Sequence, residues 1–223
     1  MKLLLRIFSV LLLLGLTGAG AFHVRIVHLV NLPMPTTGQS AQANIADQYY
    51  FAYGSNMPTR YLYNVRGVLP AHSEAGVVEN YEVSFMAPGL NSLEPAFTFL
   101  TKSESKKAYG VLHHVSKQDL VKVKESEGAL YEWATLPVEL KNGEVVAAQT
   151  LVRLSHGDVG VPSKRYLQIL IEGAREHGLP EVYVKGLLDM PSVYVPLASE
   201  LMGDVVFAFV MKNSGKCTSV FSC

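Results

Sequence analysis

The chain has 223 residues, of which 49% are hydrophobic and 17% charged, and this length is enough to bury one sizeable core. Its 19 basic and 19 acidic residues cancel, so there is no electrostatic reason to expect a nucleic acid or an acidic surface as its partner. We therefore predict a single folded domain with no nucleic-acid partner.

The first residues have the three-part pattern of a secretory signal. Lys2 and Arg6 precede an apolar run over 7–16, and residues 19–21 (Ala-Gly-Ala) form a small-residue cleavage site. We expect residues 1–21 to be a cleaved signal peptide that leads to the secretory pathway or to secretion. The alternatives are an uncleaved membrane anchor, for which the uncharged stretch is at the short limit of length, and a mis-assigned start codon. Only an uncleaved segment would bring the chain to a membrane.

A linker is expected next, over residues 22–48, because the stretch 31–48 is rich in Pro, Thr, Gln and Ala and lacks apolar periodicity. The folded domain is then predicted over 49–210. The remaining residues, 211–223, are predicted to be a flexible tail. Its Cys217 and Cys223 either close a small terminal ring or are incidental residues.

The first half of the domain has the pattern of strands with one short helix. Strands are expected at Tyr49–Tyr53, Gly76–Phe85, Ala96–Leu100 and Tyr109–Val115, and a helical segment that begins with proline at Pro58–Val65. The alternation of Val77, Tyr81, Val83 and Phe85 is typical of a half-buried strand.

The second half begins with a helix from the capping residue Ser116 through Glu125. Strands Leu136–Leu140 and Val145–Leu154 follow, and they flank Asn142-Gly143, the strongest hairpin signal in the chain. A helix begins at Pro162-Ser163, has a 3-4-spaced apolar stripe, and ends before Gly178 and Pro180. A last helix is expected at Glu181–Leu188. Strands joined mainly by hairpins, with helices between them, predict an α+β fold: a small mixed sheet or barrel flanked by helices.

The turn Gly54-Ser55-Asn56 is the first candidate for chemistry. A strand that ends in this way exposes successive backbone N–H groups, and a helix beginning at Pro58 would add positive potential. Such a turn suits a carboxylate or a developing oxyanion. An ordinary surface turn is the alternative.

Glu127 is the second candidate, because it lies where the capped helix must end, beside Gly128. The helix dipole and partial burial both bring such a carboxyl group toward the range in which it exchanges protons at neutral pH. The alternative is a solvated surface charge.

Other chemical groups carry weaker signals. His113 and His114 are adjacent on a predicted strand and face opposite sides, so they cannot bind one metal ion together. No spacing typical of a metal site occurs, and none is predicted. Ser55 lacks the sequence context of a hydrolase nucleophile. The single Trp133 is expected to be a core residue.

Four short blocks resemble, in order and approximate spacing, the signature of the γ-glutamylcyclotransferase family. They are YFAYGSNM at 50–57, ESEG at 125–128, PSKRY at 162–166 and GAREHGLP at 173–180. Each block alone is weak, but the four in this order are specific. The resemblance extends from about Tyr49 to Leu188.

The resemblance implies a small mixed β-barrel flanked by helices, and a reaction that needs no cofactor. The free α-amine of a γ-glutamyl group attacks its own γ-carbonyl carbon, which forms 5-oxoproline and releases an amine or amino acid. Glu127 matches the family's acid/base glutamate. By the same resemblance the residues that bind this small molecule are Tyr50, Phe51, Ala52, Tyr53, Gly54, Ser55, Asn56 and Tyr166.

The substrate is either a γ-glutamyl amino acid or a glutathione-derived conjugate, as in fungal sulfur-containing secondary metabolism. The alternative from another class is a catalytically silent module that binds a γ-glutamyl or small acidic ligand. Asn56, where a leucine would mark other branches, favours general γ-glutamyl amino acids. Two departures from the family pattern are Lys164, which replaces a usual proline, and a short segment before Tyr131, which leaves a binding role for Tyr131 in doubt.

Overall fold

A computed structural model of the chain describes residues 48–87, 89, 92–127, 131–152 and 158–199. The predicted leader, nearly all of the predicted linker, the last residues of the predicted domain and the tail with its two cysteines lie outside the described residues. Among the helices that are described, none is long and apolar enough to cross a membrane.

The described chain contains five strands and five short or medium helical segments. The strands are β1 (Gln48–Ala52), β2 (His72–Met86), β3 (Phe97–Val115), β4 (Glu132–Leu140) and β5 (Val145–Val152). The helices are α2 (Thr59–Tyr61), the π-helix η1 (Leu62–Arg66), α3 (Lys117–Ser126), α4 (Lys164–Glu176) and α5 (Glu181–Leu188).

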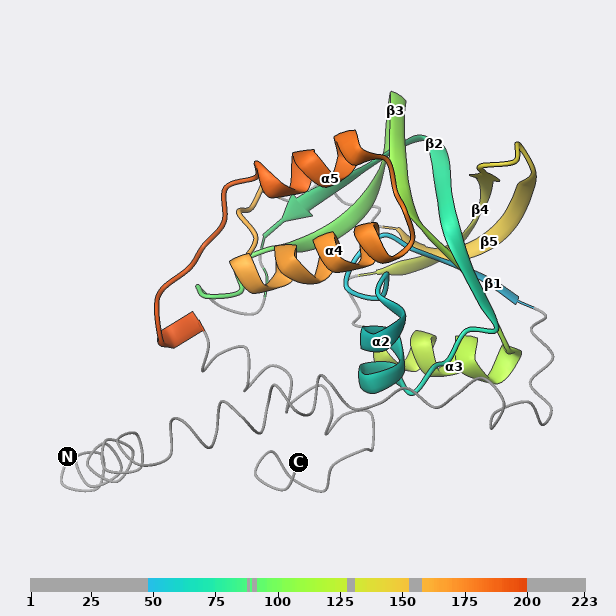
Figure 1. Ribbon diagram of the computed structural model, residues 1–223, viewed down its shortest axis with the longest axis horizontal. Helices are drawn as coiled ribbons and strands as arrows, with labels where there is room; N and C mark the ends of the chain where they lie inside the picture. The colour runs from blue at the N-terminus through green and yellow to red at the C-terminus, as the bar shows by residue number, and fades with distance from the viewer. Residues whose placement is uncertain (1–47, 88, 90–91, 128–130, 153–157, 200–223) are drawn as a thin grey trace. The chain divides into compact units, whose positions relative to one another are not determined.

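The strands form a closed barrel in the order β1-β3-β2-β4-β5 (Figure 1). All neighbours are antiparallel except β1 and β5, which close the barrel through a parallel pairing of Tyr50 with Gln149. The mixed barrel confirms the predicted α+β class.

One long strand, β3, replaces the two strands predicted at 96–100 and 109–115. Its polar middle stays extended because the long β2 supplies backbone partners, with Glu79 opposite Lys107 and Tyr81 opposite Lys102. Between these pairs the ladder shifts, and residues 103–106 stand opposite Asn80 alone. The separation into two strands was therefore wrong: exposed polar side chains do not end a strand whose backbone is paired.

Short-range signals are confirmed where they were predicted. The Ser116 and Ser163 hydroxyls cap α3 and α4 by accepting from backbone N–H groups three residues later. Gly143 (φ 83°) makes the β4–β5 turn, and Gly178 (φ 61°) follows α4. Both glycines adopt a left-handed conformation that other residues rarely take.

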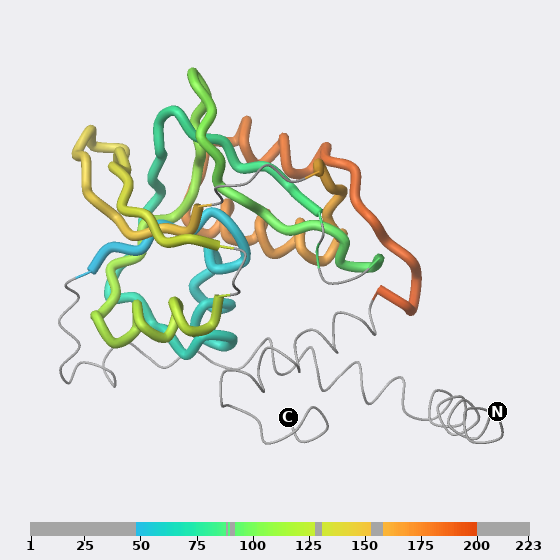
Figure 2. The backbone as a smooth tube through the Cα atoms, turned by 180° about the vertical axis from the view of Figure 1, so that it is seen from behind, coloured from blue at the N-terminus to red at the C-terminus, as the bar shows by residue number. Residues whose placement is uncertain are grey.

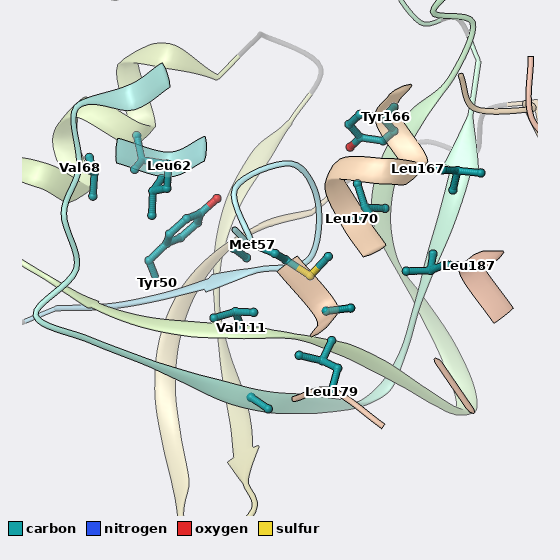
Figure 3. Packing of buried hydrophobic residues seen from close by; sticks show 14 of the residues in the cluster. Tyr50, Met57, Leu62, Val68, Val111, Tyr166, Leu167, Leu170, Leu179 and Leu187 are labelled. Carbon is teal, nitrogen blue, oxygen red and sulfur yellow. The ribbon is translucent and has the colours of Figure 1, made fainter. Parts of the chain in front are cut away.

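The helices cover two regions of the barrel. Helix α4 packs against α5 and β3, whereas α3 packs against β1 and η1, as the front and rear views show (Figures 1 and 2). The turn after β1 connects these regions, with Met57 between Tyr50 and the α4 residue Leu170 in the close view (Figure 3).

Trp133 differs from its prediction as a core residue. It is only partly buried, at the edge of both apolar clusters of the barrel, and Lys124 Nζ lies 5.0 Å from its ring centroid. A β-barrel this small leaves the indole ring at its margin, where a cation covers one face.

Candidate active site

The turn after β1 is held by its own backbone and by close neighbours. Met57 N–H donates to Gly54 O at 3.0 Å. A Cβ atom on Gly54 would lie 2.6 Å from Thr98 Oγ1 and 3.1 Å from the Tyr166 hydroxyl. Glycine is required here because a side chain has no space.

A small polar pocket opens beside this turn, with a cavity volume of about 40 Å³. Its lining residues come from β1 and the turn, from β3 and β5, from the end of α3 and from α4: Tyr50, Tyr53, Gly54, Ser55, Asn56, Thr98, Glu127, Tyr131, Leu151 and Tyr166. Seven of the nine site residues predicted from the sequence are thus brought together, although their positions in the chain span more than one hundred residues.

Two of the predicted substrate-binding residues lie elsewhere. Phe51 and Ala52 do not line the pocket, and they are 0% and 1% exposed within the two apolar clusters of the barrel. Their strand is covered on both faces, so its alternating side chains enter the core instead. Phe51 and Ala52 are therefore core residues, and their side chains do not line the pocket with the other seven.

Glu127 lies immediately after α3, as predicted, with its backbone extended. Its side chain is 13% exposed, and Oε1 accepts hydrogen bonds from Asn56 Nδ2 at 2.8 Å and Arg66 Nη2 at 3.2 Å. These two donors, one of them a guanidinium, fix the position of the Glu127 carboxyl group beside the pocket.

Arg66 was not recognised from the sequence. The π-helix η1 directs its guanidinium to three acceptors: Ser126 O at 2.9 Å, Glu127 Oε1 at 3.2 Å and Asn56 Oδ1 at 3.4 Å. No local motif marks this residue, because its partners lie 10 to 61 positions away in the chain.

Asn56 links the carboxylate to a buried phenol. Its Nδ2 donates both to Glu127 Oε1 and, at 2.9 Å, to the Tyr50 hydroxyl. Burial raises the pKa of Tyr50 above its ordinary value, and the Glu127 charge adds to this effect, so the phenol stays protonated. The pocket therefore contains a carboxylate and a neutral hydroxyl held by one amide.

The opposite wall is formed by Tyr166, Thr98 and Tyr131. The Tyr166 hydroxyl shares a hydrogen bond with Thr98 Oγ1 at 2.7 Å and accepts from Thr98 N–H at 3.3 Å. Burial raises the pKa of Tyr166 to about 12. Tyr131, whose role was in doubt, lines the same pocket, and its hydroxyl donates to Thr98 O at 3.1 Å.

The first N–H group of the helix expected beside the turn already has an acidic partner. Helix α2 begins at Thr59, whose N–H donates to both Glu176 carboxylate oxygens at 3.3 Å. Pro58 has no N–H to offer.

The two adjacent histidines face opposite sides of β3, as predicted. Fully buried His113 contacts Asn56 O and Ser73 Oγ, whereas His114 lies beside Glu74, His72 and Tyr49. Within the described ranges, no group of three or more His, Cys, Asp or Glu side chains could hold a metal ion.

Comparison with known proteins finds several to which this chain is similar. The AIG2-like family matches residues 107–187. A Bos taurus γ-glutamylcyclotransferase is 24% identical over 164 residues, which cover 70% of this chain and 86% of that protein. A γ-glutamyl cyclotransferase of Claviceps purpurea is 28% identical over 143 residues, covering 59% of this chain and 64% of that protein. A solved γ-glutamyl cyclotransferase structure has the same fold, with a TM-score of 0.58 and 21% identity over 70% of this chain and 96% of that one.

Proposed function

The chain belongs to the γ-glutamylcyclotransferase family, and on that basis we propose that it is an active cyclotransferase. Its substrate is a γ-glutamyl amino acid or the γ-glutamyl group of a glutathione-derived conjugate. The observation that carries the proposal is Glu127, held by Asn56 and Arg66 at a polar pocket next to the glycine turn.

The reaction requires one bond to form and one to break. The substrate's α-amine attacks its γ-carbonyl carbon, which closes a five-membered lactam, and the carbon–nitrogen bond to the departing amine then breaks. The products are 5-oxoproline and the free amine or amino acid, so the enzyme is a carbon–nitrogen lyase. All atoms come from the substrate.

Glu127 provides the proton transfers. The substrate ammonium has a reference pKa of about 8, as for an α-amino group, so at neutral pH it must lose a proton before it attacks. The Glu127 carboxylate accepts this proton and returns it to the leaving nitrogen. The attacking nitrogen loses a second proton as it becomes the lactam N–H, and this proton also goes to the departing amine. Arg66 supports these steps by holding the carboxylate in place through the contact between Nη2 and Oε1.

The pocket contributes orientation. Because the attack is intramolecular, holding the γ-glutamyl chain in a folded conformation can lower the barrier by roughly 7 kcal/mol or more. The backbone N–H groups of the turn hold the substrate carboxylate or the tetrahedral oxyanion.

The test is direct. The purified chain is incubated with a panel of γ-glutamyl amino acids and glutathione conjugates, and 5-oxoproline is measured by mass spectrometry. We expect turnover of at least one substrate, and a loss on the order of 10²-fold or more for Glu127→Gln, because an amide cannot carry the proton. Glu125→Gln, which changes an exposed carboxylate on α3, serves as the matched control and should keep full activity.

A silent binding module gives a different result. Such a protein would bind a γ-glutamyl ligand in calorimetry with no release of 5-oxoproline, and Glu127→Gln would change only the affinity. Activity of Glu127→Gln within about threefold of the unmodified chain would remove Glu127 from the mechanism.

A further inference from the structure

We propose that His113 is a positioning residue that aims Glu127 through Asn56. His113 lies outside the pocket lining and was considered from the sequence only as a metal ligand. The effect on turnover rests on the proposed function above, whereas the effect on Asn56 does not.

The contacts of His113 determine which nitrogen carries its proton. Its side chain is 0% exposed, with Nε2 at 3.0 Å from Asn56 O and Nδ1 at 2.8 Å from Ser73 Oγ. A carbonyl oxygen can only accept, so Nε2 must donate to Asn56. Nδ1 of the neutral ring then accepts from the Ser73 hydroxyl. Both ring nitrogens are satisfied in this one tautomer.

The surroundings keep this tautomer in place. Burial lowers the pKa of His113 to about 3, and the nearby His177, with ring centroids 5.8 Å apart, acts in the same direction. His113 therefore stays neutral throughout the physiological pH range. The hydrogen bond to Asn56 O does not switch with pH in that range.

Asn56 transmits this restraint to the pocket. His113 holds the Asn56 backbone carbonyl, while the Asn56 side-chain amide donates to Glu127 Oε1 at 2.8 Å and to Tyr50 OH at 2.9 Å. The His113 ring also stacks near Tyr50, with centroids 6.1 Å apart and an interplanar angle of 26°. The orientation of the Glu127 carboxylate and of the Tyr50 hydroxyl thus depends on His113, which lies behind the residues that line the pocket.

Two amide substitutions separate this role from simple packing. The amide nitrogen of Gln occupies a place similar to Nε2 of histidine, so His113→Gln keeps a donor for Asn56 O, whereas the shorter His113→Asn reaches only toward Ser73. We expect His113→Asn to lower kcat about tenfold with KM within about threefold, and His113→Gln to recover most of that loss. The neighbour on the opposite face offers a matched control, since His114→Asn should leave both constants unchanged.

A double-mutant cycle tests the route through Asn56. In an Asn56→Ala background, where the orienting amide is gone, His113→Asn should lower kcat no further. An equal loss in both backgrounds, or an equal loss from His114→Asn, would overturn the proposal. Thermal unfolding of each variant verifies that the folded protein is being compared.

An activity-independent measurement distinguishes this proposal from the proposed function. Absence of 5-oxoproline from the unmodified chain would refute the function only. The side-chain amide signals of Asn56 in nitrogen-edited NMR should shift in His113→Asn and return toward their original position in His113→Gln. Unshifted signals in His113→Asn would refute the positioning role whatever the activity.

Discussion

Replacing Gly54 with alanine inserts a single methyl group between the turn and the opposite wall of the pocket. The new Cβ would lie 2.6 Å from Thr98 Oγ1 and must separate from it by about 0.4 Å to reach 3.0 Å, below which such contacts essentially do not occur. Thr98 is 2% exposed and β-branched, so its side chain has little freedom to rotate away.

The displacement acts on the hydrogen bond between Thr98 Oγ1 and the Tyr166 hydroxyl, which is 2.7 Å long. Overpacking of this kind costs about 1–3 kcal/mol, and a disturbed buried hydrogen bond falls within the same range. For a protein of this size, about 2 kcal/mol corresponds to a decrease in Tm of roughly 4–8 °C. The pocket wall moves as well, so kcat/KM should fall at least about tenfold.

Calorimetry and steady-state kinetics measure these effects against Gly186→Ala. Gly186 lies in α5 and has no neighbouring atom within 4 Å of the place that a methyl group would take, so alanine there should be neutral or stabilise by up to about 1 kcal/mol. Removal of the clashing oxygen by Thr98→Ala should reduce the further loss caused by Gly54→Ala. If Gly54→Ala unfolds at the original temperature with unchanged kinetics, the steric reasoning is refuted.

Three further predictions follow from the site. Arg66→Met should lower kcat, and it should lower the free energy of unfolding by about 1–3 kcal/mol, because Ser126 O and Glu127 Oε1 both lose the Arg66 donor and Glu127 is left with the hydrogen bond from Asn56. Arg66→Lys should recover part of both losses in kinetics and urea unfolding, and no change in Arg66→Met would contradict the pairing. Burial lowers the pKa of His113 to about 3 in the folded protein, whereas it is about 6.5 in the unfolded chain, so the unfolded chain binds the proton first as the pH falls. The contribution of this group to stability is therefore full above about pH 6.5. Below that, the free energy of unfolding falls toward pH 3 by up to about 1.4 kcal/mol per pH unit. Urea titrations should show a shallower fall for His113→Gln, and an identical slope would exclude this group as a source. Extensive dialysis against a chelator should leave turnover unchanged, whereas recovery of lost activity with zinc or magnesium would reveal a metal requirement.

Interactions within a few residues were readable from the sequence. The caps at Ser116 and Ser163, the hairpin at Asn142-Gly143 and the helix end at Gly178 each depend on backbone groups close by in the chain. Residue type alone restricts such local geometry, so these elements could be predicted without knowing the fold.

The sequence also predicted that Glu127 lies at the end of a helix, and the block around Glu127 resembled part of a family signature. It contained no signal for Arg66, which bonds to Glu127 across 61 positions, and none for the pairing of Thr98 with Tyr166 across 68. Phe51 and Ala52 were assigned to the pocket by their place in a motif, but the closed barrel covers both faces of β1 and directs them into the core.

His113 best illustrates the difference between what the sequence predicts and what only the tertiary structure determines. Strand alternation predicted that it faces away from His114, but only the packing of β3 against the turn brings its ring to Asn56, 57 positions away. Periodicity determines the side of a strand that a residue faces, because neighbouring peptide units alternate. What lies on that side depends on how the barrel closes and which helices cover it, and these contacts between distant segments exist only in the tertiary structure.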